Sequence, residues 1–165
     1  MMDAFVWLEN TPPSLFMRED FYAYFVALIG HAIGMAFLIG GGLLVSLRVM
    51  GVGSGAPVAS FRAFYPWMWF GLVLAVISGI ALLFGYPAKA LTNPIFALKF
   101  ACLGGAALVL RHLSRNYFKG DAELPRKSRQ LALLALVLWL GVVICGKLLL
   151  YTNRMLMASH ELPVY

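Results

Sequence analysis

The strongest constraint on this chain is a set of four long runs of apolar residues. They cover residues 21–47, 64–86, 95–110 and 131–151. A helix needs roughly 20 apolar residues to cross the hydrocarbon core of a bilayer, and about 17 to 25 are usual. Three runs reach this length, and the short third run can gain reach through the long side chain of Arg111, which follows it. We therefore expect an all-α protein with four transmembrane helices in an antiparallel bundle.

The composition and the segments between the runs support one membrane domain that covers residues 1–165. Hydrophobic residues make up 62% of the chain and charged residues 12%, whereas soluble domains carry roughly 25% charged residues. Glycine and proline interrupt the apolar pattern at residues 50–57 and 85–94, and a polar segment follows at residues 114–130. Proline is favoured in the first turn of a helix, so we expect Asn93 and Pro94 to begin the third helix.

The basic residues predict how the helices are oriented in the membrane. The net charge is +6, and eight of the 13 Lys and Arg residues flank the first and third breaks between the runs. These eight are Arg48, Arg62, Arg111, Arg115, Lys119, Arg126, Lys127 and Arg129. Because cytoplasmic loops are enriched in Lys and Arg, we expect this end in the cytoplasm and both termini outside, in the periplasm. Topology accounts for the positive charge, so no nucleic-acid partner is expected.

Small residues at helical spacing predict close contacts between the helices. Gly30 and Gly34 lie one turn apart in the first run, beside His31. Ala75 and Gly79 in the second run have the same spacing, which lets helix backbones approach each other. We therefore expect a compact bundle in which His31 lies next to a glycine seam.

One histidine, two lysines and two cysteines fall at similar depths within the runs. His31 interrupts the apolar stretch VALIGHAIGMAFLIGGG near the middle of the first run. Lys99 is four residues into the third run, and Lys147 is four residues from the end of the fourth. A rise of about 1.5 Å per residue places these three side chains in the outer half of the bundle, with Cys102 and Cys145 about one turn deeper. The two cysteines are expected to be buried thiols rather than a disulfide.

No acidic residue lies inside a predicted span. The seven acidic residues are Asp3, Glu9, Glu19, Asp20, Asp121, Glu123 and Glu161. Burying a charge in the membrane costs about 3 kcal/mol or more on insertion scales. The lysines can avoid this cost by reaching the outer surface, by meeting Glu19 or Asp20 at the rim, or by facing a bound anionic group. Haem propionates, a phospholipid head group or a polar quinone ring would serve, so His31, Lys99 and Lys147 are the candidate ligand-binding residues.

Three roles are open to the His31 side chain. It can be a neutral ring hydrogen-bonded to a helix carbonyl or to Ser78, it can contact a quinone, or it can bind metal as an axial ligand of haem b. Haem b in a helical bundle usually takes two axial side chains at one level. His112 should lie about 15 Å from His31 along the bundle. The second axial position would then fall to Met35, Cys102, Cys145, an open site or a partner subunit.

The missing carboxylates also argue against several classes of function. Proton- and cation-coupled transporters normally place Asp or Glu in the membrane, and neither residue type occurs in the four runs. The sequence shows no nucleophile–base arrangement and no phosphate-binding loop, which argues against a hydrolase or a nucleotide-driven protein. An enzymatic role is therefore not favoured.

Several stretches of the chain resemble one bacterial protein family. They are, in chain order, WLENTPPSLFMRE, IGHAIGMAFLIGG, YPWMWFG, NPIFALKF and LWLGVVICGKLLLYT, and they span about residues 7–152. The chain resembles a family of uncharacterised four-helix integral membrane proteins (a domain of unknown function), which is distantly similar to copper-resistance D and cytochrome b561-type bundles. The resemblance implies four helices in the bacterial inner membrane and a family pattern that includes His31, Gly34, Lys99 and Lys147. It also implies haem b as a candidate cofactor.

Together these features favour a non-catalytic membrane subunit or anchor of a larger, redox-linked assembly in the bacterial inner membrane. Its expected partners are membrane lipid and other membrane subunits, and a polar or anionic ligand is expected near His31, Lys99 and Lys147. One alternative is a b-type cytochrome that passes electrons through a haem held by His31. Another is a quinone- or lipid-binding module.

Overall fold

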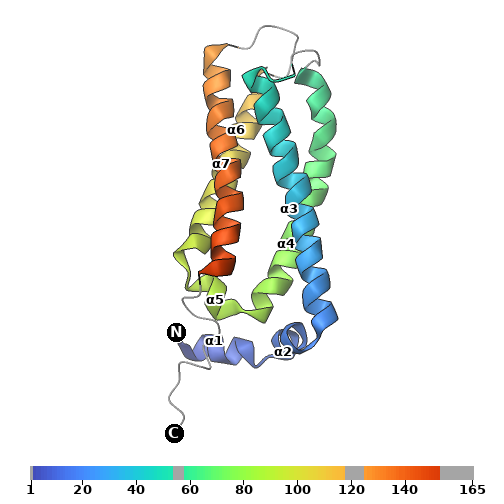
Figure 1. Ribbon diagram of the computed structural model, residues 1–165, viewed down its shortest axis with the longest axis vertical. Coiled ribbons are helices and arrows are strands. Elements are labelled where there is room, and N and C mark those ends of the chain that lie inside the picture. Colours follow the sequence, from blue (N-terminus) through green and yellow to red (C-terminus); the bar gives the residue numbers. More distant parts are fainter. Residues whose placement is uncertain (1, 54–57, 118–124, 153–165) are drawn as a thin grey trace.

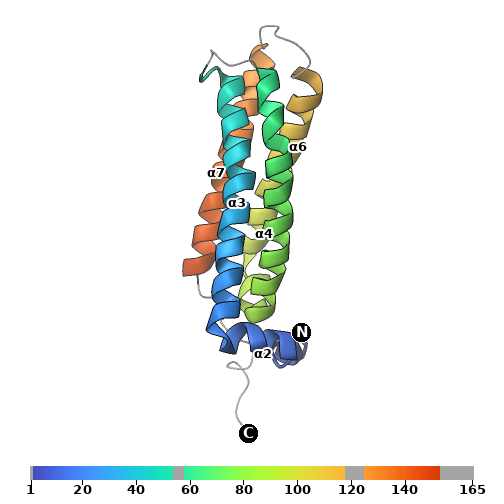
Figure 2. The same cartoon turned by 90° about the vertical axis from the view of Figure 1, so that its right-hand side faces the viewer.

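The computed structural model describes residues 2–53, 58–117 and 125–152, and within these ranges every regular element is a helix. Four helices are long and apolar enough to cross a membrane, which confirms the four predicted spans. They are α3 (Phe21–Met50), α4 (Tyr65–Gly85), α6 (Pro94–Tyr117) and α7 (Arg126–Tyr151). All four extend along the long axis of the molecule (Figures 1 and 2).

Three of the long helices extend further than the apolar runs that predicted them, and the extension is greatest for α6 and α7. The third run was expected to end at residue 110, but α6 continues through Arg111 to Tyr117. The fourth was expected to begin at residue 131, but α7 already begins at Arg126. Arginine and lysine are good helix formers, so a helix can continue past the point where its apolar run stops. The basic residues near these ends, which include Arg111, Arg115, Arg126 and Arg129, define what we call the arginine end of the bundle.

Three short helices that the apolar pattern did not predict lie at the opposite end, which we call the short-helix end (Figure 1). They are α1 (Met2–Glu9), α2 (Pro12–Glu19) and α5 (Pro87–Leu91). Asp20 ends α2 and caps α3, because its side chain accepts a hydrogen bond from the Ala23 N–H at 2.8 Å. The predicted start of the third helix is confirmed: α6 begins at Pro94, and the Asn93 side-chain oxygen accepts from the Ile95 N–H at 3.0 Å.

Local turn structure ends α3 and precedes α4. α3 ends at Gly51, which has a φ of 106° and donates its N–H to the Arg48 carbonyl. This left-handed conformation is readily adopted by glycine and is a common helix C-cap. A 3₁₀ helix, η1 (Val58–Phe64), then leads into α4.

The long helices pack as two pairs joined along one interface. α3 packs against α4, α6 packs against α7, and α3 and α7 join the two pairs. In contrast, α4 and α6 barely touch each other. The four helices therefore do not form a complete ring of contacts, because α4 and α6 lack a direct helix–helix interface.

Glycine allows a close backbone contact between α3 and α4. A side-chain carbon at Gly34 would lie 2.6 Å from the Ala75 backbone nitrogen and 2.8 Å from the Gly71 carbonyl oxygen. Real Cβ atoms do not approach backbone this closely, so glycine is required for the two helices to meet here. At Gly30 a Cβ would make ordinary contacts, with Ser78 Cβ at 3.6 Å. This seam brings the α4 backbone up to His31.

The apolar core fills the half of the bundle at the arginine end. Its buried members are Leu38, Ile39, Val45, Val49, Met68, Ala106, Leu110, Leu113, Ala132, Ala135, Trp139 and Val142. On α3 these residues all follow His31, and on α6 they all follow Lys99, in the direction of the arginine end. The level of His31 and Lys99 therefore lies outside the main apolar core.

Candidate functional site

The His31 side chain extends from α3 and contacts the backbone of α4. Its Nδ1 atom lies 2.9 Å from the Ala75 carbonyl oxygen. Because a carbonyl oxygen can only accept, Nδ1 carries the proton and donates it in this hydrogen bond. The Ser78 hydroxyl lies 3.4 Å from the same nitrogen and itself donates to the Leu74 carbonyl at 2.6 Å. The expected contacts with a helix carbonyl and with Ser78 are thus both present.

A glycine on α4 provides the space for the imidazole ring. A side-chain carbon at Gly79 would lie 3.2 Å from His31 Cε1 and 3.3 Å from Nδ1, which is tighter than an ordinary van der Waals contact. Gly79 and Ala75 were predicted only as small residues that let helices pack. In the structure they also form the surface on which His31 lies.

Lys99 reaches His31 from α6. Its Nζ atom lies 3.5 Å from His31 Nε2. Since Nδ1 carries the ring proton, Nε2 has a lone pair and accepts from the lysine N–H in a long, weak hydrogen bond. Both side chains are half-buried. The pair therefore connects all of α3, α4 and α6 at one level.

No acidic residue of the four long helices balances the lysine at this level. The sequences of α3, α4, α6 and α7 contain no Asp or Glu. Within the described ranges, Lys99 forms no ion pair, and its only hydrogen-bond partner is His31. An ammonium group with three N–H donors and one weak acceptor can still donate to further groups.

Two thiols lie next to this pair. Cys102 and Cys145 are both free, and Cys145 is buried and close to Lys99. The two side chains contact each other, and a Cβ at Gly141 would lie 3.2 Å from Cys102 Sγ. The cysteines are therefore thiols packed between α6 and α7, as the sequence predicted.

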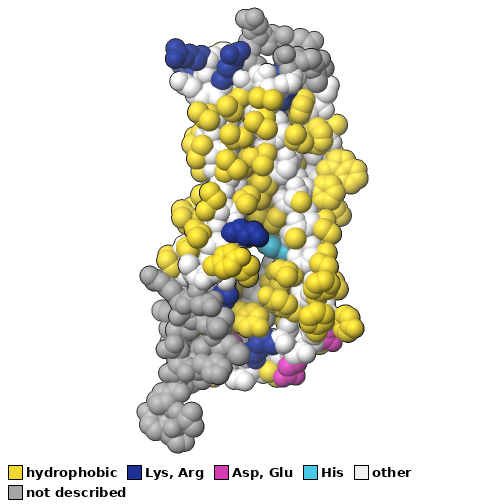
Figure 3. Space-filling model, viewed as in Figure 1, with side chains coloured by type: hydrophobic (Ala, Val, Ile, Leu, Met, Phe, Trp, Pro, Cys, Tyr) yellow, Lys and Arg dark blue, Asp and Glu magenta, His cyan; other side chains and the backbone are white. Residues whose placement is uncertain are grey.

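Lys147 does not join the site. It is exposed on α7 and makes no hydrogen bond or ion pair with any residue that the structure describes. The structure thus brings together two of the three predicted site residues, His31 and Lys99. On the face shown in Figure 3, a histidine and a basic side chain lie next to each other within a band of hydrophobic side chains.

The surroundings of His31 fit haem poorly. A histidine that binds a metal through Nε2 also donates its Nδ1 proton to a carbonyl, so Nε2 decides the fit, and it faces the amine of Lys99 where an iron ion would need to be. His112 is exposed near the arginine end, Met35 packs against the apolar core, and His160 lies outside the described residues. In the described part of the chain, no group of three or more His, Cys, Asp or Glu side chains could hold a metal ion.

Comparisons of the chain with protein-family models, with curated proteins and with solved structures find no match. The function must therefore be inferred from the chemistry of His31, Lys99 and their surroundings.

Proposed function

We propose that this protein is a non-catalytic, four-helix subunit of the bacterial inner membrane that binds an amphiphilic ligand at His31 and Lys99. The ligand would have an anionic or hydrogen-bond-accepting head group. The observation that carries the proposal is the Lys99 amine, 3.5 Å from His31 Nε2 and without a carboxylate at its level. The helices would be antiparallel, with both termini outside and the arginine end in the cytoplasm.

The Lys99 amine has no carboxylate partner in the four long helices, and this costs free energy in a membrane. On insertion scales a lysine costs about 2.5–3.5 kcal/mol at the centre of a membrane helix and less toward the ends, and Lys99 lies in the second turn of α6. One long hydrogen bond to a neutral imidazole offsets little of that cost, because such bonds contribute about 1 kcal/mol even with good geometry. A quinone carbonyl, a phosphate or a carboxylate would accept further hydrogen bonds from Lys99. Ionisable residues within membrane helices are accordingly most often functional.

The same contacts argue against catalysis at this site. The His31 Nδ1 proton is donated to a helix carbonyl, and the Ser78 hydroxyl proton is donated to another. Neither group is arranged as a nucleophile activated by a base. A binding role agrees better with this geometry.

Large apolar side chains on the outer faces of the helices support a membrane-embedded assembly. Leu108 on α6 is 69% exposed and Ile77 on α4 is 63% exposed. Such side chains need lipid tails or the helices of partner subunits around them. Recovery of a defined complex in mild detergent would support the subunit role, and a lone monomer without any bound molecule would contradict it.

The ligand proposal is tested by identifying what co-purifies with the protein. Wild type, Lys99→Met and Lys147→Met are purified in mild detergent, and bound small molecules are extracted and identified by mass spectrometry. We expect an amphiphile in near-stoichiometric amount in wild type and Lys147→Met, and a loss of about tenfold or more in Lys99→Met. A quinone is distinguished from a lipid by its redox-dependent ultraviolet absorbance. Equal amounts in all three proteins would refute a site at Lys99.

The cytochrome alternative is tested on the same samples. Absorption spectra are recorded for the oxidised and the dithionite-reduced protein, with His31→Ala alongside. We expect no haem bands, because the His31 Nε2 atom that would bind the iron faces the Lys99 amine. A Soret band that disappears in His31→Ala would replace the binding proposal with a b-type cytochrome.

A further inference from the structure

A pocket lies between α4 and α6, on the side of His31 toward the arginine end. It has a volume of about 750 Å³, which is within the roughly 300–1,000 Å³ range of ligand-binding pockets. Because α4 and α6 barely touch, the pocket opens sideways between them, toward the region that lipid occupies in a membrane. A molecule could therefore enter it directly from the bilayer.

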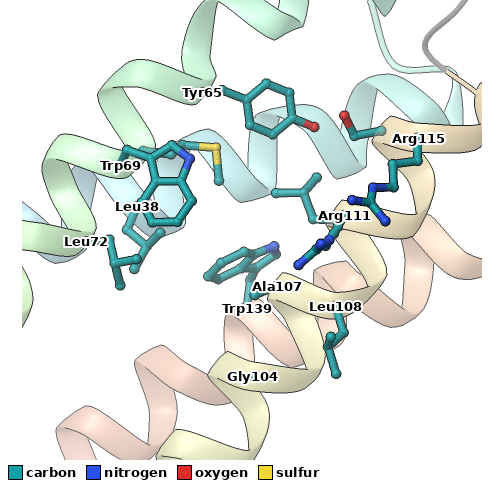
Figure 4. A pocket seen from close by; sticks show the side chains of 13 residues that line it. Leu38, Tyr65, Trp69, Leu72, Gly104, Ala107, Leu108, Arg111, Arg115 and Trp139 are labelled. Carbon is teal, nitrogen blue, oxygen red and sulfur yellow. The ribbon is translucent and has the colours of Figure 1, made fainter.

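The pocket is amphipathic along its length. Apolar side chains, among them Leu38, Leu72 and Leu108, line one part of it. Arg111 and Arg115 line another part, and both extend from α6 in the close-up view (Figure 4). The two arginines are four residues apart, so they lie on one face of the helix. This arrangement resembles the division of a lipid into an apolar tail and a charged head.

The two arginines have no acidic partner in the part of the chain that the structure describes. Both are exposed, and neither forms an ion pair there. None of the residues that line the pocket is Asp or Glu. A guanidinium group binds a phosphate with two parallel hydrogen bonds. Two guanidinium groups one turn apart therefore favour an anionic, phosphate-bearing head group.

A buried tryptophan supplies an independent observation. Trp139 on α7 is only 1% exposed, yet its Nε1–H has no hydrogen-bond partner in the described residues. Its indole is held against Gly42, where a Cβ would lie 2.5 Å from Nε1. Figure 4 shows the indole nitrogen on the side of the ring nearest Arg111. Buried N–H groups almost always have an acceptor, and the residues that the structure describes supply none for this indole, which lines the pocket.

We propose that the pocket between α4 and α6 binds an anionic glycerophospholipid of the adjacent leaflet. The phosphate would lie against Arg111 and Arg115, an acyl chain would follow the apolar lining, and an ester or phosphate oxygen would accept the Trp139 N–H. Basic pockets between transmembrane helices are known to bind such head groups. This site is separate from His31 and Lys99, and it does not depend on the function proposed for them.

The test measures lipid preference by native mass spectrometry of the full chain. Wild type is compared in detergent with added phosphatidylglycerol, which is anionic, or phosphatidylcholine, which is zwitterionic. The test variant is Arg111→Gln/Arg115→Gln. The matched control is Arg126→Gln/Arg129→Gln, which removes the same charge at the same end from exposed residues that do not line the pocket. We expect wild type and control to prefer phosphatidylglycerol about tenfold, and the test variant to retain less than a twofold preference.

A second variant addresses the tryptophan and guards against misfolding. Trp139→Phe keeps the aromatic ring but removes the N–H, so we expect about threefold weaker binding of phosphatidylglycerol. Far-UV circular dichroism confirms that each variant is folded before binding is compared.

If the two double arginine variants reduce binding equally, the effect is one of general surface charge and the proposal fails. It also fails if wild type is a dimer that Arg111→Gln/Arg115→Gln dissociates without changing lipid preference, because a second copy would then occupy the pocket.

Discussion

At the scale of single residues, Lys99 combines a cost in stability with a capacity to bind. Its amine is half-buried at membrane depth and has one weak acceptor, His31 Nε2. Residues retained for binding often reduce the stability of the protein that carries them. The stability of a variant without this lysine therefore tests whether Lys99 is held for function or for structure.

We predict that Lys99→Met unfolds with a free energy equal to or up to about 1 kcal/mol above that of wild type when no ligand is bound, because an uncompensated amine is replaced by an apolar side chain of similar length. Unfolding in mixed detergent micelles, followed by circular dichroism, gives this difference. Lys147→Met is the control, and its exposed position should keep the change within about 0.5 kcal/mol. A clear loss of stability in Lys99→Met alone would show that the amine is structural.

The sequence predicted the depth of the site residues but not their direction. Counting residues along the helices placed His31, Lys99 and Lys147 at similar depths. Whether side chains on different helices meet depends on how each helix is rotated about its axis, and that rotation is set by packing. Only His31 and Lys99 meet. The Ala75 carbonyl could not be identified beforehand, because every residue of a helix has one.

At the scale of helices, the contact between α3 and α4 depends on glycine on both sides, Gly34 on α3 and Gly71 on α4. The backbone of α4 passes within the space that a Gly34 side chain would need. Gly40 lies on the same helix and has open space around it, because a methyl group added there would meet no heavy atom within 4 Å. Gly34 and Gly40 therefore form a matched pair for testing the seam.

We predict that Gly34→Ala lowers the free energy of unfolding by about 1–3 kcal/mol, the usual cost of overpacking. Gly40→Ala should leave it unchanged or raise it slightly, since alanine is the better helix former by about 1 kcal/mol. Thermal unfolding of both variants in the same detergent measures the difference. Equal stability of the two would show that the helices are not as close at Gly34 as described.

Long helices were predictable and short ones were not, for a physical reason. An apolar run of membrane length has few alternatives to a spanning helix, so all four spans were found. α1, α2 and α5 are too short for such a signal, and α2 and α5 begin with proline, which breaks a helix when it lies in the interior. In α2 and α5 proline lies in the first turn, where it has no hydrogen bond to lose. Tertiary contacts at the short-helix end then complete these helices.

At the scale of the whole molecule, the bundle has two halves of different character. The half at the arginine end holds the apolar core and the pocket that faces Arg111 and Arg115. The other half holds His31 and Lys99, outside that core. Composition and hydropathy do not say which helices pack against each other, so neither the incomplete contact between α4 and α6 nor the resulting pocket could be predicted from them. Both depend on which helix pairs pack.

The orientation of these halves in the membrane decides which side of the cell each site faces, and it can be measured directly. We predict that the arginine end is cytoplasmic, because Lys and Arg are retained on that side. Single cysteines are introduced as Glu19→Cys and Arg126→Cys, both at exposed positions, in a background in which Cys102 and Cys145 are replaced by alanine. A membrane-impermeant maleimide should label Glu19→Cys in intact spheroplasts and Arg126→Cys only after permeabilisation. The reverse pattern would invert the topology, and the phospholipid at Arg111 and Arg115 would then have to come from the outer leaflet.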